Sequence, residues 1–364
     1  MGAGGVKLIT LSMIVKNEEA TLANCLKSIR DFVDEIIIVD TGSTDGTLAL
    51  LDDFNRSNRP IRVESFAWCD DFSAARNYAL SFVHTPWTLT LDADDIVLNP
   101  EILPGLAQAA HKDRATGVWS IYKQDDSCFQ RRLQLFKTKQ YRWKGIVHES
   151  PQPKPGITED TILSDLKVLH RKPADRCPKA ARQYLDILLQ KDPDNWLGIA
   201  ESYKFLACHP DENTSVRECL ELADANYYQA YSWDKTNEAT KYVCLFNLAR
   251  LNLDLARFDA KHGFQARAFA QLGVAVEPLR AECWTLLGQA NELLGDKELA
   301  GRCYTKALQL EPPTDTIGLV FPDYYSKTPA RLLEGIKAWA DAERTEQAID
   351  DVLMGERLIY TPKR

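Results

Sequence analysis

Residues 35–47 read Glu-Ile-Ile-Ile-Val-Asp-Thr-Gly-Ser-Thr-Asp-Gly-Thr, an apolar run that ends in a carboxylate and continues into turn-forming residues. The β-branched run predicts a strand over residues 35–40. The Gly-Ser-Thr-Asp-Gly stretch predicts a turn that leads into a helix over residues 47–54. A strand that passes through a turn into a helix is the first half of a strand–helix–strand unit, in which the strands are parallel.

The same alternation extends to both sides of this stretch. Apolar runs of strand length occur at residues 8–15, 61–63 and 87–91, and apolar residues at helical spacing occur at residues 18–29 and 73–83. This order predicts an α/β, Rossmann-like domain with a mostly parallel sheet and crossover helices. Ligands bind such sheets at the carboxyl ends of the strands, where Asp40 and Asp92 both lie.

The chain changes character near residue 175. Residues 145–175 are rich in proline and glycine, and we expect them to form a long ordered excursion that closes the first domain. Strand signals then disappear, and helical patterns cover Ala180–Gln190, Trp196–Cys208, Glu238–Phe258 and Arg267–Val276. We therefore predict an α/β domain over residues 1–175 and an all-α domain over residues 176–364.

One helical segment has the residue spacing of a known repeat. Counted from Ala281, the positions 4, 7, 8, 20, 24, 27 and 32 hold Trp284, Leu287, Gly288, Ala300, Tyr304, Ala307 and Pro312. This spacing resembles the 34-residue tetratricopeptide pattern, with Asn291 where an aromatic residue is usual. Such repeats bury their faces only against neighbours, so we expect the surrounding helices to extend the stack.

Composition narrows the class of protein. The 364 residues are 45% hydrophobic and 26% charged, which is typical of a globular protein and excludes a disordered or collagen-like chain. The net charge of -8 is spread over both halves and argues against general attraction to nucleic acid or anionic lipid. Nine cysteines without a C-x-x-C pair, no apolar run of about 18 residues and no signal peptide predict a reduced, cytoplasmic protein without a transmembrane segment.

Acidic residues crowd the end of the strand predicted at residues 87–91. Asp92, Asp94 and Asp95 follow it directly. Carboxylates this close repel one another unless a cation lies between them, and Mg²⁺ or Mn²⁺ prefers oxygen ligands. The alternative is a solvated loop whose aspartates cap a helix, and a D-x-D pattern alone does not decide between the two.

Four further motifs occur in order with this acidic run. They are Leu11–Glu18, Ile38–Thr47, Trp68–Asn77 with D-F-S-x-x-R-N, and W-x-G-x-V-H-E ending at Glu149. Together the motifs resemble the inverting glycosyltransferases of family 2, which have the GT-A fold, over about residues 7–175. The resemblance implies transfer of a sugar from a nucleoside-diphosphate sugar, expected to be UDP-linked, with Mg²⁺ or Mn²⁺ as the metal and inversion at the anomeric carbon.

The resemblance also implies residues that bind the donor. Asp40 would bind the base, with capping of the next helix as the alternative, and the main chain near Lys16–Glu18 would contact base or ribose. Asp45 could contribute, although its Ser-Thr-Asp-Gly context is also ordinary turn chemistry. Arg76 could contact the base or diphosphate, or orient the acidic cluster by pairing with it. Asp92 and Ala93 belong to the motif that contacts the donor.

A second set of implied residues concerns catalysis. The resemblance makes Glu149 the general base that deprotonates the acceptor, and it places Asp92 and Asp94 at the metal. His148 stands where the wider family has an acid, and it could be a base, a metal or phosphate ligand, or a packed histidine. His170 would join Asp94 as a metal ligand, with a structural role as the alternative. Arg171 and Lys172 could meet the leaving diphosphate or be a solvated charge pair.

The sequence leaves several chemical classes of acceptor possible. The helical region favours a polymeric acceptor, either peptide or protein or saccharide, because a repeat array offers a concave surface. A basic run beside Glu149 keeps hydroxymethylated DNA open, because phosphate contacts need such side chains; it comprises Arg131, Arg132, Lys137, Lys139, Arg142 and Lys144. Another alternative is a non-catalytic adaptor with a degenerate transferase domain. The helical region could also form a homo-oligomer.

Overall fold

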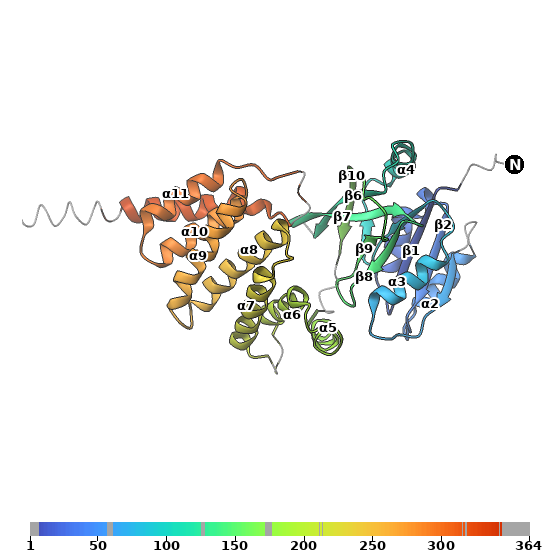
Figure 1. Cartoon of the computed structure of the whole chain (residues 1–364), viewed down its shortest axis with the longest axis horizontal. Helices are drawn as coiled ribbons and strands as arrows, with labels where there is room; N and C mark the ends of the chain where they lie inside the picture. The colour runs from blue at the N-terminus through green and yellow to red at the C-terminus, as the bar shows by residue number, and fades with distance from the viewer. Residues whose placement is uncertain are drawn as a thin grey trace, which may run out of the picture. The chain divides into compact units, whose positions relative to one another are not determined.

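The computed structural model describes residues 7–56, 61–124, 128–171, 177–210, 212, 214–314, 316, 319–341 and 343. The chain forms two compact units. The first extends to Ala230 and includes Thr314–Val320, and the second comprises Tyr231–Pro313 and the residues from Phe321 onward. Figure 1 shows the strands of the first unit in blue to green and helices of the second in yellow to red.

An eight-stranded sheet organises the first unit, with the strand order β3-β2-β1-β4-β7-β6-β10-β5. Its strands are β1 (Ile9–Val15), β2 (Glu35–Asp40), β3 (Arg62–Ser65), β4 (Trp87–Thr90), β5 (Asp95–Val97), β6 (Gly117–Gln124), β7 (Cys128–Lys137) and β10 (Thr161–His170). The pairs β1–β2, β1–β4, β2–β3 and β6–β10 are parallel, and β7 is antiparallel to both of its neighbours. The predicted mostly parallel α/β sheet is therefore confirmed.

The strand predicted over residues 35–40 is β2, with the same bounds. Ile36, Ile37, Ile38 and Val39 are all buried, so both faces of this strand are covered. A strand buried on both faces has a continuous apolar run, whereas a strand with one wet face alternates apolar and polar residues. This difference explains why the run at residues 35–40 was a clear signal.

Helices connect the strands of the first unit. They are α1 (Leu22–Ile29), α2 (Thr47–Asn55), α3 (Phe72–Ser81) and α4 (Leu103–Lys112), with short 3₁₀ turns at Arg30–Phe32 and Pro100–Ile102. The buried residues of α1 are Leu22, Cys25, Leu26 and Ile29, and this helical spacing directs one face into the core. Residues 145–175 contain two strands, β9 (Ser150–Pro153) and β10. Strand β9 pairs with β8 (Tyr141–Lys144) in a separate two-stranded sheet.

Helices follow the last strand. They are α5 (Cys177–Lys191), α6 (Trp196–Cys208), α7 (Val216–Ser232), α8 (Glu238–Leu255), α9 (Lys261–Val276), α10 (Ala281–Leu293) and α11 (Lys297–Leu308), with a 3₁₀ turn at Pro322–Tyr325. The first unit extends beyond residue 175, since the Tyr184 ring of α5 packs edge-on against Phe72 at 5.4 Å between centroids. Residue 175 marks where the strands end, and its use as a domain boundary stays a prediction. Within the described ranges, no helix is both long and apolar enough to cross a membrane.

The repeat predicted from Ala281 is the helix pair α10–α11. Gly288 on α10 lies directly against the buried ring of Tyr304 on α11, and a Cβ at Gly288 would lie 2.2 Å from Tyr304 Cε1. The Tyr304 hydroxyl donates to Glu292 Oε2 at 2.8 Å, which holds the ring in place. The glycine and tyrosine of the repeat pattern are therefore one close contact between two helices.

Gly288→Ala should destabilise the second unit by about 1–3 kcal/mol, because the added methyl group overpacks this contact. The matched control is Gly301→Ala on α11, where the new Cβ would lie 3.5 Å from Ile336 Cγ2, an ordinary contact. Thermal unfolding followed by far-UV circular dichroism measures both. A Gly288→Ala protein that unfolds at the wild-type temperature would contradict the contact.

Candidate active site

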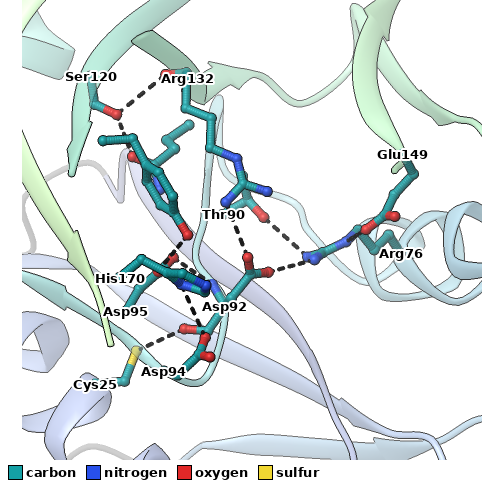
Figure 2. A network of polar contacts seen from close by, with 12 residues as sticks. Cys25, Arg76, Thr90, Asp92, Asp94, Asp95, Ser120, Arg132, Glu149 and His170 are labelled. Atoms are coloured by element: carbon teal, nitrogen blue, oxygen red, sulfur yellow. Dashed lines mark hydrogen bonds and ion pairs between the residues drawn. The ribbon is translucent and has the colours of Figure 1, made fainter. Parts of the chain in front are cut away.

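The acidic cluster lies at the carboxyl end of β4, near the middle of the sheet. The loops after β1 and β2 lie on one side of it, and β7 and β6 lie on the other. Figure 2 shows Asp92 between two arginine side chains, with His170 and Asp95 to its left and Asp94 below it in the view. The topology therefore brings charged groups from β4, α3, β7 and β10 to one place.

Arg76 joins two of the predicted site residues. Its Nη2 donates to Asp92 Oδ1 at 2.6 Å and its Nε donates to Glu149 Oε1 at 2.5 Å (Figure 2). The guanidinium lies 4.7 Å from the centre of the Trp143 ring and its side chain is 9% exposed. Burial lowers the pKa of Arg76, but the two carboxylates outweigh it and raise the pKa above its usual value. Of the two roles predicted for Arg76, the structure shows the pairing with the acidic cluster.

Arg132 on β7 holds the other oxygen of Asp92. Its Nη1 donates to Asp92 Oδ2 at 3.1 Å, and its guanidinium lies 4.5 Å from the centre of the Tyr122 ring. Burial raises the pKa of Asp92, but Arg132 and Arg76 together hold it well below its usual range. In the sequence Arg132 is recognisable only as one of several residues in a basic run. Its spacing in that run does not indicate that it pairs with Asp92.

Asp94, Asp95 and His170 form the second half of the cluster. His170 Nδ1 lies 2.9 Å from Asp95 Oδ1 and 3.3 Å from Asp94 Oδ1. Asp95 is fully buried and accepts from the Tyr122 hydroxyl at 2.8 Å and from the Asp92 amide at 2.9 Å. The predicted pair of Asp94 and His170 is thus brought together. Asp95, which was not among the predicted ligands, is the nearer neighbour, because β5 and β10 pair His170 with Asp95.

Negative charge exceeds positive charge in this cluster. Two arginines, Arg76 and Arg132, face four carboxylates, which belong to Asp92, Asp94, Asp95 and Glu149. The pKa of Asp94 is raised to about 6, chiefly by burial; Asp92 and Asp95 also raise this pKa, and His170 lowers it. A carboxyl whose charge is disfavoured by its neighbours is suited to a cation.

The donor set fits a divalent ion. One oxygen or nitrogen atom each of Asp92, Asp95 and His170 lies within 4.8 Å of the others. Asp94 lies beside His170 with its side chain 11% exposed. Carboxylate oxygens suit Mg²⁺ and Mn²⁺, and an imidazole nitrogen is compatible with Mn²⁺.

Helix α3 holds the segment that carries Glu149. The Asn77 side chain accepts from the Trp143 amide at 2.9 Å and donates to the Trp143 carbonyl at 3.0 Å. The Phe72 amide donates to the Ile146 carbonyl at 2.9 Å. Gly145 has a φ of 102°, and a Cβ there would lie 3.2 Å from the Glu149 Cα, so the turn needs glycine. His148 is exposed and has a φ of 58°.

The loops after β1 and β2 are tied to each other. Asn17 Oδ1 accepts from the Thr44 amide at 2.7 Å, and Thr47 Oγ1 accepts from the Glu18 amide at 2.7 Å. Asp40 is buried and accepts from the Gly42 amide at 3.0 Å and the Ser43 amide at 3.1 Å. These bonds give the edge predicted to bind the nucleotide a defined shape before any ligand arrives.

Four other residues were predicted to contact the donor, and the structure shows their contacts or their exposure. Burial raises the pKa of Asp45, but bonds from Thr47 and the Glu19 amide keep it below its usual value, and Asp45 thereby orders the turn before α2. Lys16 is exposed and Ala93 is buried in the core. The Arg171 amide donates to the Asp94 carbonyl at 2.9 Å and its side chain is exposed. Lys172 lies outside the described residues.

A cavity of about 230 Å³ opens beside Asp92. Its walls include Asp92, Arg132, Gln134, Trp119, Trp143 and Glu149. Glu149 Oε1 is occupied by Arg76, while Oε2 makes no hydrogen bond to any residue that the structure describes. A carboxylate oxygen that faces a polar cavity and lacks a partner can accept a proton from a bound molecule.

Comparison with known proteins gives two family matches. Residues 10–176 match the model of glycosyl transferase family 2, and residues 281–314 match a tetratricopeptide repeat. The second match coincides with α10–α11 and confirms the predicted repeat.

Curated relatives match parts of the chain. The lipopolysaccharide core biosynthesis glycosyltransferase LpsC of Rhizobium meliloti is 37% identical over 44% of this chain and 62% of its own length. The SPbeta prophage-derived glycosyltransferase SunS of Bacillus subtilis is 27% identical over 52% of this chain and 47% of its own length. A TPR repeat-containing protein of Synechococcus elongatus is 42% identical over 24% of this chain and 20% of its own length. The chain therefore spans between a fifth and about three-fifths of these relatives.

Among solved structures, S. aureus TarS 1-349 in complex with UDP-GlcNAc aligns with a TM-score of 0.37 and 13% identity, over 83% of this chain and 91% of that one. The family model covers the sheet, the acidic cluster and Glu149. The chain thus carries a glycosyl transferase family 2 domain at residues 10–176 and a tetratricopeptide repeat at residues 281–314.

Proposed function

We propose that this protein transfers a sugar from a nucleoside-diphosphate sugar, with UDP as the nucleotide, to a polymeric acceptor in a single displacement. The observation that carries the proposal is Arg76, which holds Asp92 and Glu149 on the wall of one cavity. A transferase of this class needs one charged group at the diphosphate and another at the attacking hydroxyl or other nucleophile. Arg76 brings the two groups, Asp92 and Glu149, together although they lie far apart in the chain.

Glu149 would act as the general base. Its partner-free oxygen Oε2 would take the proton of the acceptor while the acceptor attacks the anomeric carbon and the bond from that carbon to the diphosphate breaks. Arg76 keeps the carboxylate in one orientation, which lowers the cost of aligning base and nucleophile. Inversion at the anomeric carbon follows from a single displacement.

Asp94 and His170 would hold a Mn²⁺ or Mg²⁺ ion, with Asp95 behind them. Such an ion, when bound, neutralises charge on the leaving diphosphate. Both oxygens of Asp92 accept hydrogen bonds from arginines. We therefore propose that Asp92 acts on the donor mainly by positioning Arg76 and Arg132. Asp40, Asp45 and the Lys16–Glu18 segment would form the nucleotide edge.

For the acceptor we propose a saccharide or a peptide. The similarity to LpsC, a lipopolysaccharide core biosynthesis glycosyltransferase, supports a saccharide. The basic run was the reason to consider modified DNA as an acceptor. Some of its side chains contact groups of the protein itself. Arg131 is buried and donates to the Ser164 and Thr314 carbonyls, and Arg132 binds Asp92. Two of its six cations thus have partners inside the protein, which favours the other acceptors.

Calorimetric titration with UDP, with and without Mn²⁺, tests the proposal. We expect UDP to bind and Mn²⁺ to strengthen the binding, and Asp94→Ala to reduce the gain from Mn²⁺ by at least about tenfold. Asp53→Ala is the control, because Asp53 forms only an exposed pair with Arg56. If UDP, GDP, TDP and CDP all fail to bind the wild-type protein, the transferase proposal is wrong and an adaptor role gains support.

A further inference from the structure

One wall of the cavity beside Asp92 carries a buried amide with an unused end. Gln134 on β7 is 2% exposed and lines this cavity. Its Oε1 accepts from the Ser120 hydroxyl, whereas its Nε2 has no hydrogen-bond partner among the residues that the structure describes. This Nε2 is not among the fully buried polar atoms that lack a partner, so it is open to the cavity and can donate to a molecule bound there.

Ser120 contacts one end of this amide and a main-chain carbonyl with the same hydroxyl. Its hydroxyl lies on β6 and also contacts the Arg132 carbonyl at 3.2 Å, on the same strand as Gln134. Figure 2 shows Ser120 beside the main chain of Arg132, across from Asp92. With Oε1 held by the serine, the donor end of Gln134 is left for the cavity.

The strand order indicates which part of a substrate would lie there. The loops proposed to bind the nucleotide follow β2 and β1, Asp92 follows β4, and Gln134 lies on β7, the next strand in the same direction. Leu89 pairs with Leu135, which places Gln134 close to Thr90, and both line the cavity. A donor that runs from nucleotide to diphosphate to sugar along this edge places its sugar at β7.

We propose that Gln134 is a specificity-determining residue that donates a hydrogen bond from Nε2 to an oxygen of the transferred sugar. The inference rests on the function proposed above and adds where the sugar lies. The cavity of about 230 Å³ has room for several water molecules or one small polar ring, and not for a nucleotide as well. A site built to hydrogen-bond one substrate atom rejects analogues that lack it, so this amide would select among donor sugars.

Gln134→Leu tests the proposal, with binding of UDP, UDP-glucose, UDP-galactose and UDP-N-acetylglucosamine as the readout. We expect UDP itself to bind as to the wild type. The preferred UDP-sugar should lose about tenfold in affinity, the loss expected for one hydrogen bond. Ser120→Ala should weaken the same sugar by less, because it only loosens the amide. Gln130→Leu is the matched control, since Gln130 lies on the same strand and does not line the cavity.

The outcomes separate this inference from the proposed function. If wild-type protein binds no UDP, the proposed function fails first. If UDP binds but Gln134→Leu leaves every UDP-sugar unchanged, or weakens UDP and UDP-sugars equally, the inference is wrong and the function stands. If the variant hydrolyses the UDP-sugar in water as the wild type does, yet shows a raised acceptor KM, Gln134 reads the acceptor instead and the inference is again overturned.

Discussion

Glu149→Gln should lower the rate of sugar transfer by about 10²–10⁴-fold and leave UDP binding intact. The amide keeps the size of the side chain and can still accept from Arg76, but it cannot take a proton from the acceptor. The loss should therefore appear in kcat at saturating donor. Transfer to an identified acceptor, measured as UDP release, gives the rate.

The matched control for this prediction is Glu159→Gln. Glu159 lines the same cavity, but its recorded partner is the Tyr141 hydroxyl at 3.2 Å, and it makes no ion pair with Arg76. We expect the control to keep most of its activity. If Glu159→Gln is inactive and Glu149→Gln is active, the base has been assigned to the wrong carboxylate.

Arg76→Leu should destabilise the first unit by about 3–5 kcal/mol. The change leaves Glu149 without its cation and Asp92 with Arg132 alone, in a place where the arginine side chain is only 9% exposed. A buried charge that loses its partner costs this much, whereas an exposed pair contributes little. Urea unfolding followed by tryptophan fluorescence measures the change, since Trp143 packs against the guanidinium.

Two further variants show whether charge causes the loss. Arg56→Leu removes an exposed helical pair with Asp53 and should cost about 0.5 kcal/mol or less. Adding Glu149→Gln to Arg76→Leu removes the carboxylate that was left without a cation and should recover part of the stability. A loss for Arg76→Leu as small as that for Arg56→Leu would refute the structural importance of the bridge.

Much of the fold could be predicted from the sequence because it depends on local patterns. The run at residues 35–40 is a strand with those bounds, and the helix predicted at Trp196–Cys208 is α6 with those bounds. The tetratricopeptide spacing identified α10–α11, and two positions of the pattern, Gly288 and Tyr304, form one close contact between these successive helices. The helix predicted from residue 18 begins at Leu22, since residues 18–21 are used to meet the loop after β2.

The candidate site could be predicted only in part. Asp92 and Asp94 stood out because they follow a strand, and Glu149 and Arg76 stood out through family motifs. Asp95 was recognised as part of the acidic run but not as the partner of His170, which lies 75 residues later. Gln134 was missed, because its partner Ser120 lies 14 residues earlier on another strand.

The sequence by itself determined the family, the alternation of strands and helices, and the position of the acidic cluster at a strand end. These features follow from periodicity, turn chemistry and motif order, which are properties of neighbouring residues. Only the tertiary structure decided that Arg76 bridges Asp92 and Glu149, that Arg132 serves the site, and that Gln134 presents an unused donor. Those pairings depend on which strands lie side by side and in which register, and periodicity shows which face a residue occupies but not which distant residue it meets.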